Sequence, residues 1–112
     1  MNTISWDDFQ KIELLAGTII EASVFSEARK PAYKLTVDFG EKVGIKKSSA
    51  QITALYTPEE LIGKQVLAVV NFPPKQIGPM MSECLVTGVH RDNGDVVLAV
   101  PDNIVPNGAR LA

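Results

Sequence analysis

The sequence predicts a mainly β protein in which about five strands close into a small barrel, accompanied by two short helices. Two observations support this fold class. Short runs of β-branched and aromatic residues recur along the chain between turn residues, and only two segments carry helix-start signals. With 112 residues, of which 46% are apolar, the chain is long enough for one hydrophobic core, and we expect a single domain over residues 1–112.

The first expected element is a short amphipathic helix from about Ser5 to Ile12. Ser5 followed by Asp8 three positions later matches a capping box, with aspartate as the returning acid. Trp6, Phe9 and Ile12 recur at three-residue intervals and give this helix one apolar edge. Because so short a helix is unstable alone, it needs a surface to lie against.

Three strands are expected next, over residues 17–25, 33–39 and 43–49. Apolar and polar side chains alternate along residues 33–39, which is typical of a half-buried strand. The short turn at Gly40-Glu-Lys42 predicts that the second and third strands pair as a hairpin.

The second half of the chain begins with a helix start at Thr57-Pro58-Glu59-Glu60, and Gly63 ends this helix. Residues 65–72 are apolar on both faces and predict a central, buried strand. A strand at 85–89, a turn at Asp92-Asn-Gly-Asp95 and a strand at 96–100 follow. Between 72 and 85, three prolines interrupt the sheet and predict a stiff loop.

A short helix between the third and fourth strands is the element order of an OB-fold, a five-stranded Greek-key barrel. An SH3-like barrel is the alternative on strand number alone. It lacks a natural place for the helix that begins near Thr57.

The charge balance does not favour a protein that coats nucleic acid by bulk charge, because 13 acidic residues outnumber 11 basic ones. A local basic patch is compatible with this balance. The single cysteine, Cys84, excludes an internal disulfide and fits a reducing compartment. No apolar run approaches the ~18 residues of a membrane span. The first nine residues have no signal-peptide pattern, so we expect a cytoplasmic protein.

The chain offers few groups for catalysis. His90 is the only histidine and Cys84 the only thiol, so a cluster of histidine ligands for a metal cannot form. No phosphate-cradling glycine motif is present. The adjacent acids Asp7 and Asp8, like those at 59 and 60, stand at helix starts, where they complement the helix dipole. We therefore predict that the protein is not an enzyme and has no cofactor or metal.

Four segments resemble the CsaA proteins: NFPPKQIGPMMSECLV at 71–86, KSSAQIT at 47–53, YTPEELIGKQV at 56–66 and PDNIVPNG at 101–108. CsaA proteins belong to the wider family of tRNA-binding domains, which also occur appended to methionyl- and phenylalanyl-tRNA synthetases. The resemblance extends from Phe9 to Gly108. It implies an OB barrel, a homodimer formed through the N-terminal helix and C-terminal segments, and a chaperone role in protein export.

The resemblance also implies a ligand surface on the barrel for nucleic acid or polypeptide. Relatives that bind tRNA carry several basic residues in the proline-rich loop, whereas only Lys75 is present here. OB-folds hold ligands with the loops that join strands 1 to 2 and 4 to 5, and basic residues lie in or beside both loops. We expect the tRNA-contacting residues to be Arg29, Lys30, Lys34, Lys47, Asn71, Phe72, Lys75 and Ser82.

Two further surfaces are expected. Flexible thioethers suit adaptable apolar contacts with polypeptides, which makes Ile77, Met80 and Met81 candidates, unless the methionines pack beneath the loop. Dimer contacts are expected from Trp6, Phe9, Ile12, Ile104, Val105 and Leu111, unless the N-terminal helix plugs the barrel. The expected function is a CsaA-like homodimeric chaperone that retains a tRNA-binding surface. The alternative is a dedicated tRNA-binding protein whose chaperone activity is incidental.

Overall fold

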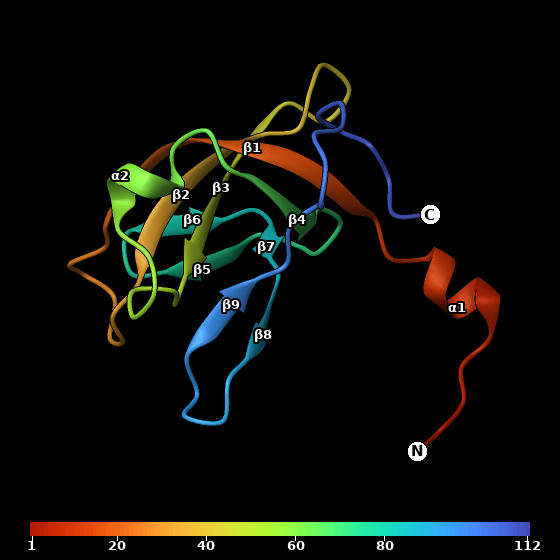
Figure 1. The fold of residues 1–112 in the computed structure, drawn as a ribbon, viewed down its shortest axis with the longest axis horizontal. Coiled ribbons are helices and arrows are strands. Elements are labelled where there is room, and N and C mark those ends of the chain that lie inside the picture. The colour runs from red at the N-terminus through yellow and green to blue at the C-terminus, as the bar shows by residue number, and fades with distance from the viewer.

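Five antiparallel strands in the order β3-β2-β1-β4-β7 form the main sheet, and two small hairpins, β5–β6 and β8–β9, extend it (Figure 1). The computed structural model describes residues 1–112. The elements are α1 (Trp6–Gln10), β1 (Leu14–Val24), β2 (Tyr33–Asp38), β3 (Ile45–Ala50), α2 (Pro58–Leu61), β4 (Gln65–Val69), β5 (Lys75–Ile77), β6 (Met80–Ser82), β7 (Leu85–Val86), β8 (Gly88–His90) and β9 (Val96–Leu98).

The long strand β1 curls the sheet because it pairs with different neighbours along its length. Its first half lies against β4, with Leu14 opposite Val69, and its second half lies against β2. A bulge between Ile19 and Glu21 separates the two halves, and a bulge bends a strand and increases its twist. The predicted mainly β, five-stranded barrel, consistent with an OB-fold, is therefore confirmed.

The far edge of the barrel is closed by the segment between β6 and β7. The backbone amide of Glu83 donates to the Lys47 carbonyl oxygen at 2.7 Å. The buried Ser48 hydroxyl donates to the Cys84 carbonyl oxygen at 3.0 Å. These two bonds hold β3 against the segment that follows β6, so the barrel is nearly closed.

The core fills the barrel with alternate side chains of its strands, among them Ile19, Val37, Phe39 and Val66, all of them buried. Gly17 is required where β1 crosses this core. A Cβ atom added there would lie 2.7 Å from both the Phe39 ring and the Val37 side chain. Leu61 of α2 is also fully buried, which places this short helix over one end of the barrel.

Both predicted capping boxes are confirmed. The Ser5 hydroxyl accepts from the Asp8 amide at 3.0 Å, and the Thr57 hydroxyl accepts from the Glu60 amide at 3.4 Å. Helix α1 lies outside the barrel and buries none of its residues, so it does not plug the barrel (Figure 1). Neither helix is long and apolar enough to span a membrane.

The segment between 72 and 85 does interrupt the main sheet, but the expectation of a loop without strands is wrong, because residues 75–82 form the separate β5–β6 hairpin. Lys75 pairs with Ser82 and Ile77 with Met80, and the chain reverses at Gly78, which has a φ of 55°. The prolines lie before β5 and at the turn, outside the paired positions, since proline cannot donate to a strand ladder. The expected strand over 85–89 is also divided, into β7 and β8.

Candidate ligand-binding surface

Three adjoining pockets lie around the β5–β6 hairpin, the β1–β2 loop and the edge of β3. We name them by their linings. The cationic pocket, of about 630 Å³, is lined by Glu27, Ala28, Arg29, Lys30, Ala32, Ser49, Gln51, Lys75, Gln76, Ile77 and Gly78. The apolar pocket, of about 460 Å³, is lined by Ser49, Phe72, Pro73, Lys75, Ile77, Ser82, Glu83, Cys84 and Leu85.

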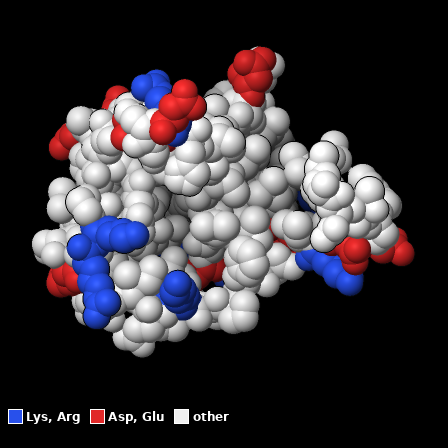
Figure 2. Space-filling view, turned by 90° about the horizontal axis from the view of Figure 1, so that it is seen from below, with Lys and Arg blue, Asp and Glu red and all other residues white.

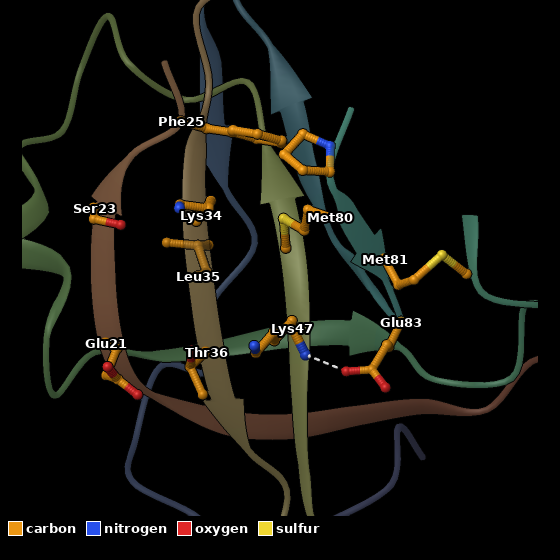
Figure 3. Close-up of a pocket in the computed structure, with 11 residues that line it drawn as sticks. Glu21, Ser23, Phe25, Lys34, Leu35, Thr36, Lys47, Met80, Met81 and Glu83 are labelled. Carbon is orange, nitrogen blue, oxygen red and sulfur yellow. Dashed lines mark hydrogen bonds between the residues drawn. The ribbon is translucent and has the colours of Figure 1, made fainter. Parts of the chain in front are cut away.

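The mixed-charge pocket, of about 780 Å³, is lined by Glu21, Ser23, Phe25, Lys34, Leu35, Thr36, Lys47, Pro79, Met80, Met81 and Glu83 (Figure 3). The three pockets form one continuous surface, because neighbouring pockets share lining residues. Ser49, Lys75 and Ile77 belong to both the cationic and the apolar pocket, and Glu83 belongs to both the apolar and the mixed-charge pocket.

A small hydrophobic cluster beneath the surface holds the β1–β2 loop against the hairpin. It consists of Phe25, Ala32 and Met80, all buried, with Ala28 and Ile77 packed on them. A backbone hydrogen bond of 3.0 Å from Phe25 to Ala32 closes the base of the loop. Residues that lie some fifty positions apart in the sequence are thereby brought to one pocket.

The cationic pocket concentrates positive charge. Arg29 and Lys30 approach it from the β1–β2 loop, and Lys75 approaches it from the start of β5. All three residues are exposed, and none forms an ion pair. Glu27 is the only acid in the lining. Figure 2 shows lysine and arginine side chains gathered at its left-hand end, where the β1–β2 loop lies in Figure 1.

The mixed-charge pocket balances two lysines against two glutamates. Lys34 of β2 places its ammonium 5.8 Å from the centre of the Phe25 ring, within range of a cation–π contact. The Lys47 backbone amide donates to a Glu83 carboxylate oxygen at 3.0 Å, the contact drawn as a dashed line in Figure 3. Met81 is 45% exposed at the margin, so this pocket combines both charges with apolar surface.

The apolar pocket exposes hydrophobic side chains around a buried thiol. Phe72 is 56% exposed and Leu85 is 50% exposed, whereas Cys84 is buried. Burial raises the pKa of the Cys84 thiol to about 11, which makes it an inert core group. The Ser82 hydroxyl accepts from the Ser49 amide at 3.3 Å and donates to the Cys84 carbonyl oxygen at 3.4 Å.

The structure brings seven of the eight residues predicted for tRNA contact to this surface. The cationic pocket holds Arg29, Lys30 and Lys75, the mixed-charge pocket holds Lys34 and Lys47, and the apolar pocket holds Phe72 and Ser82. Asn71 lines none of the three pockets. The side-chain oxygen of Asn71 accepts from the Glu13 backbone amide at 3.0 Å, and its side-chain nitrogen donates to the Lys11 backbone carbonyl oxygen at 2.7 Å.

The candidates for polypeptide contact have different environments. Met81 is exposed and Ile77 is half-buried, but Met80 is packed in the cluster beneath the β1–β2 loop. The alternative that a methionine packs under this segment therefore holds for Met80. Sequence reasoning did not identify Gln51, Gln76, Pro73, Glu83 and Leu85, which also line the pockets.

Most of the candidates for a dimer contact meet at a smaller pocket of about 250 Å³ beside α1. Trp6, Phe9, Ile12 and Leu111 line it together with Gln10, Arg110 and Ala112. Arg110 joins the two chain ends, because its guanidinium bonds the Glu13 carboxylate and, at 2.9 Å, the Gln10 carbonyl oxygen. Ile104 and Val105 lie outside this pocket.

No group of three or more His, Cys, Asp or Glu side chains is arranged to hold a metal ion. A small β-barrel with its pockets beside the β1–β2 loop and the connection after β4 has the architecture of an OB-fold ligand-binding domain.

Comparisons with known proteins agree with this class. The family model described as "Putative tRNA binding domain" matches residues 14–110. The crystal structure of the chaperone CsaA from Bacillus anthracis is 48% identical and superimposes with a TM-score of 0.93, covering 99% of this chain and 100% of that chain. CsaA from Picrophilus torridus is 51% identical with a TM-score of 0.91, covering 98% of this chain and 100% of that chain.

Curated relatives include the methionine–tRNA ligase of Methanothrix thermoacetophila, which is 38% identical over 96% of this chain. The chain spans only about 15% of the length of the ligase. The chain therefore belongs to the tRNA-binding-domain family, and it is CsaA-like over its whole length. The match is full-length with the CsaA proteins but covers only this small part of the ligase, so the activity of the ligase does not extend to this chain.

Proposed function

We propose that the protein is a cytoplasmic, homodimeric CsaA-like chaperone with a role in protein export, built as one domain over residues 1–112, and that it retains a tRNA-binding surface. The observation that supports this most strongly is the cationic pocket. Residues from two separate segments place three cations around one pocket that has a single acidic residue in its lining.

The tRNA-binding part of the proposal rests on charge. Arg29, Lys30 and Lys75 have no acidic partner in the structure, so their charges are available to an incoming anion. Phosphate groups supply such anions at regular spacing along a nucleic acid. Because the net charge of the chain is −2, the protein as a whole does not attract nucleic acid. Attraction is therefore confined to the cationic pocket.

The chaperone part rests on the mixed-charge pocket. Unfolded polypeptides present acidic, basic and apolar groups together, and this pocket offers Lys34 and Lys47, Glu21 and Glu83, and the exposed Met81 thioether. A flexible methionine adapts to side chains of different shape. The two ligand classes would therefore use neighbouring parts of one surface.

The homodimer rests on α1. Trp6 is 62% exposed and Ile12 43% exposed, and both line the small pocket beside α1, to which Leu111 also contributes. Exposed apolar groups gathered in one patch mark an interaction surface, and a two-fold contact uses the same patch on each copy. Light scattering at micromolar concentration should give the mass of two chains, and a monomer mass would contradict the dimer.

The experiment that separates the functions uses salt. Filter binding with total tRNA should weaken steeply between a low and a higher salt concentration, because phosphate contacts release counterions. Suppression of aggregation of an unfolded client should weaken much less over the same range, because salt screens contacts with the charged groups of the mixed-charge pocket but does not weaken apolar burial. If tRNA binds but aggregation is not suppressed, the alternative of a dedicated tRNA-binding protein is correct. If neither occurs, the proposal fails.

A further inference from the structure

The apolar and cationic pockets are one composite site joined at Lys75. Lys75, Ser49 and Ile77 line both pockets, so the two pockets adjoin and a ligand that extends past these residues contacts both. On one side of Lys75 lie two further cations, Arg29 and Lys30. On the other side lie apolar groups of the apolar pocket, including the exposed ring of Phe72.

We propose that the apolar pocket takes one unpaired nucleobase of a bound RNA, stacked on Phe72, while the adjoining phosphates contact Lys75 and the cations of the β1–β2 loop. This inference rests on the proposed tRNA-binding function and specifies its ligand. The composite site recognises a single-stranded segment with an exposed base, and a base-paired stem cannot fill it.

The chemistry of the lining carries this choice. A ligand that satisfies both pockets needs a flat, weakly polar group attached directly to closely spaced anions, and a nucleotide has this composition. Base stacking on aromatic side chains tolerates any base, because every base has a π-face. The apolar pocket volume of about 460 Å³ is within the range of small-ligand sites.

A polypeptide fits the composite site less well. Its backbone is uncharged, so it supplies anions only at its terminus or at acidic side chains, whereas every nucleotide brings a phosphate to the three unpaired cations. Glu83, the single acid of the apolar pocket, lies at the border with the mixed-charge pocket, which places the phosphates on the Lys75 side.

The lining also predicts that the apolar pocket does not distinguish one type of base from another. The Ser82 hydroxyl and the Ser49 amide already bond each other, and the remaining wall is formed by Phe72, Ile77 and Leu85 among others. Of the charged lining residues, Lys75 is assigned to the phosphates, and a Glu83 carboxylate oxygen accepts from the Lys47 amide. We therefore expect similar affinities for different unpaired bases, with differences that follow stacking strength.

The test uses a single-stranded RNA of about ten nucleotides that carries one central 2-aminopurine, a fluorescent base sensitive to stacking. The same strand annealed to its complement is the comparison ligand. We expect the single strand to bind the wild-type protein about ten-fold or more tightly than the duplex, and its fluorescence to change on binding.

Phe72→Ala should weaken binding of the single strand about 5- to 150-fold and abolish the fluorescence change, while leaving the salt dependence of binding unchanged. Lys75→Ala should instead lower the salt dependence, because it removes a phosphate contact. Ile62→Ala is the matched control: Ile62 is similarly exposed, at 54%, but lines none of the three pockets, and its loss should leave binding unaltered.

The outcomes distinguish this inference from the proposed function. If the wild-type protein binds neither tRNA nor the single strand, both fail. If it binds tRNA but binds duplex as tightly as single strand, or if Phe72→Ala leaves affinity and fluorescence unchanged, only the base site is overturned. Displacement of the RNA from the wild-type protein by an apolar peptide, with no effect of salt, would assign the apolar pocket to polypeptide and overturn the inference.

Discussion

Replacing Asn71 with alanine should destabilise the protein and leave the tRNA affinity of the folded molecule unchanged. The sequence motif suggests a ligand contact for this residue, but its amide joins the end of β4 to the segment between α1 and β1. It accepts from the Glu13 amide at 3.0 Å and donates to the Lys11 carbonyl oxygen at 2.7 Å. A backbone hydrogen bond of 3.0 Å from Val70 to Glu13 lies beside them.

The expected loss follows from these two hydrogen bonds. A net contribution of about 0.5–1.5 kcal/mol is typical for each, and Asn71 is exposed, so water replaces part of what is lost. We expect a decrease of about 1–2 kcal/mol in the free energy of unfolding. For a domain of this size, that decrease lowers the melting temperature by roughly 4–10 °C.

The assay combines thermal unfolding with tRNA binding at a temperature where the variant is folded. Asn71→Asp retains the acceptor but loses the donor, and should give an intermediate melting temperature. Asn103→Ala is the control, because its amide only contacts the neighbouring Asp102, at 3.4 Å. Fluorescence of Trp6, the single tryptophan, reports on α1 directly. An unchanged melting temperature together with weakened tRNA binding would refute this reasoning and return Asn71 to the ligand site.

Three other predictions concern the pockets and the core. Lys75→Ala should lower the magnitude of the log–log salt slope of tRNA binding by about 0.7–0.9, with stability within about 0.5 kcal/mol of wild type. Lys42→Ala, outside the pockets, should leave the slope unchanged, and equal slopes for both variants would disprove the phosphate contact. Gly17→Ala should cost about 1–3 kcal/mol in a urea titration, because the new methyl group meets the Phe39 ring at 2.7 Å. The Cys84 thiol should react slowly with a disulfide reagent at pH 8 until the protein is denatured. The pKa of the Cys84 thiol is raised from 9.0 to about 11 in the folded protein, so between these pH values the thiol ionises in the unfolded chain but not in the folded one. The free energy of unfolding should therefore fall as the pH rises from about 9 towards 11.

Features that depend on neighbouring residues could be predicted from the sequence. The capping boxes at Ser5 and Thr57 require only a hydroxyl and an acid three positions apart, and both form as expected. The hairpin turn before β9 requires a residue that adopts positive φ, and Gly94 supplies it with a φ of 93°. The order of these local elements was sufficient to predict the barrel.

Features that depend on distant residues were not predictable in the same way. Strands β5 and β6 have three residues each, too few for a recognisable alternation, and prolines obscure them further. The role of Asn71 depends on backbone groups some sixty positions earlier in the chain. Nothing in the local pattern around Asn71 distinguishes an amide that faces a ligand from one that bonds a distant backbone.

Met80 shows that the sequence alone does not separate the two alternatives for a methionine, which are an exposed contact surface and packing beneath the loop. Its thioether suggests an adaptable contact surface, but it is buried with Phe25 and Ala32, which precede it by about fifty residues. This cluster fixes the β1–β2 loop to the hairpin and so sets the distance between Arg29 and Lys75 across the cationic pocket. The proline-interrupted segment therefore has two separate tasks. Its buried side anchors a loop, and its exposed side, at Lys75 and Met81, lines the pockets that we propose as the ligand surface.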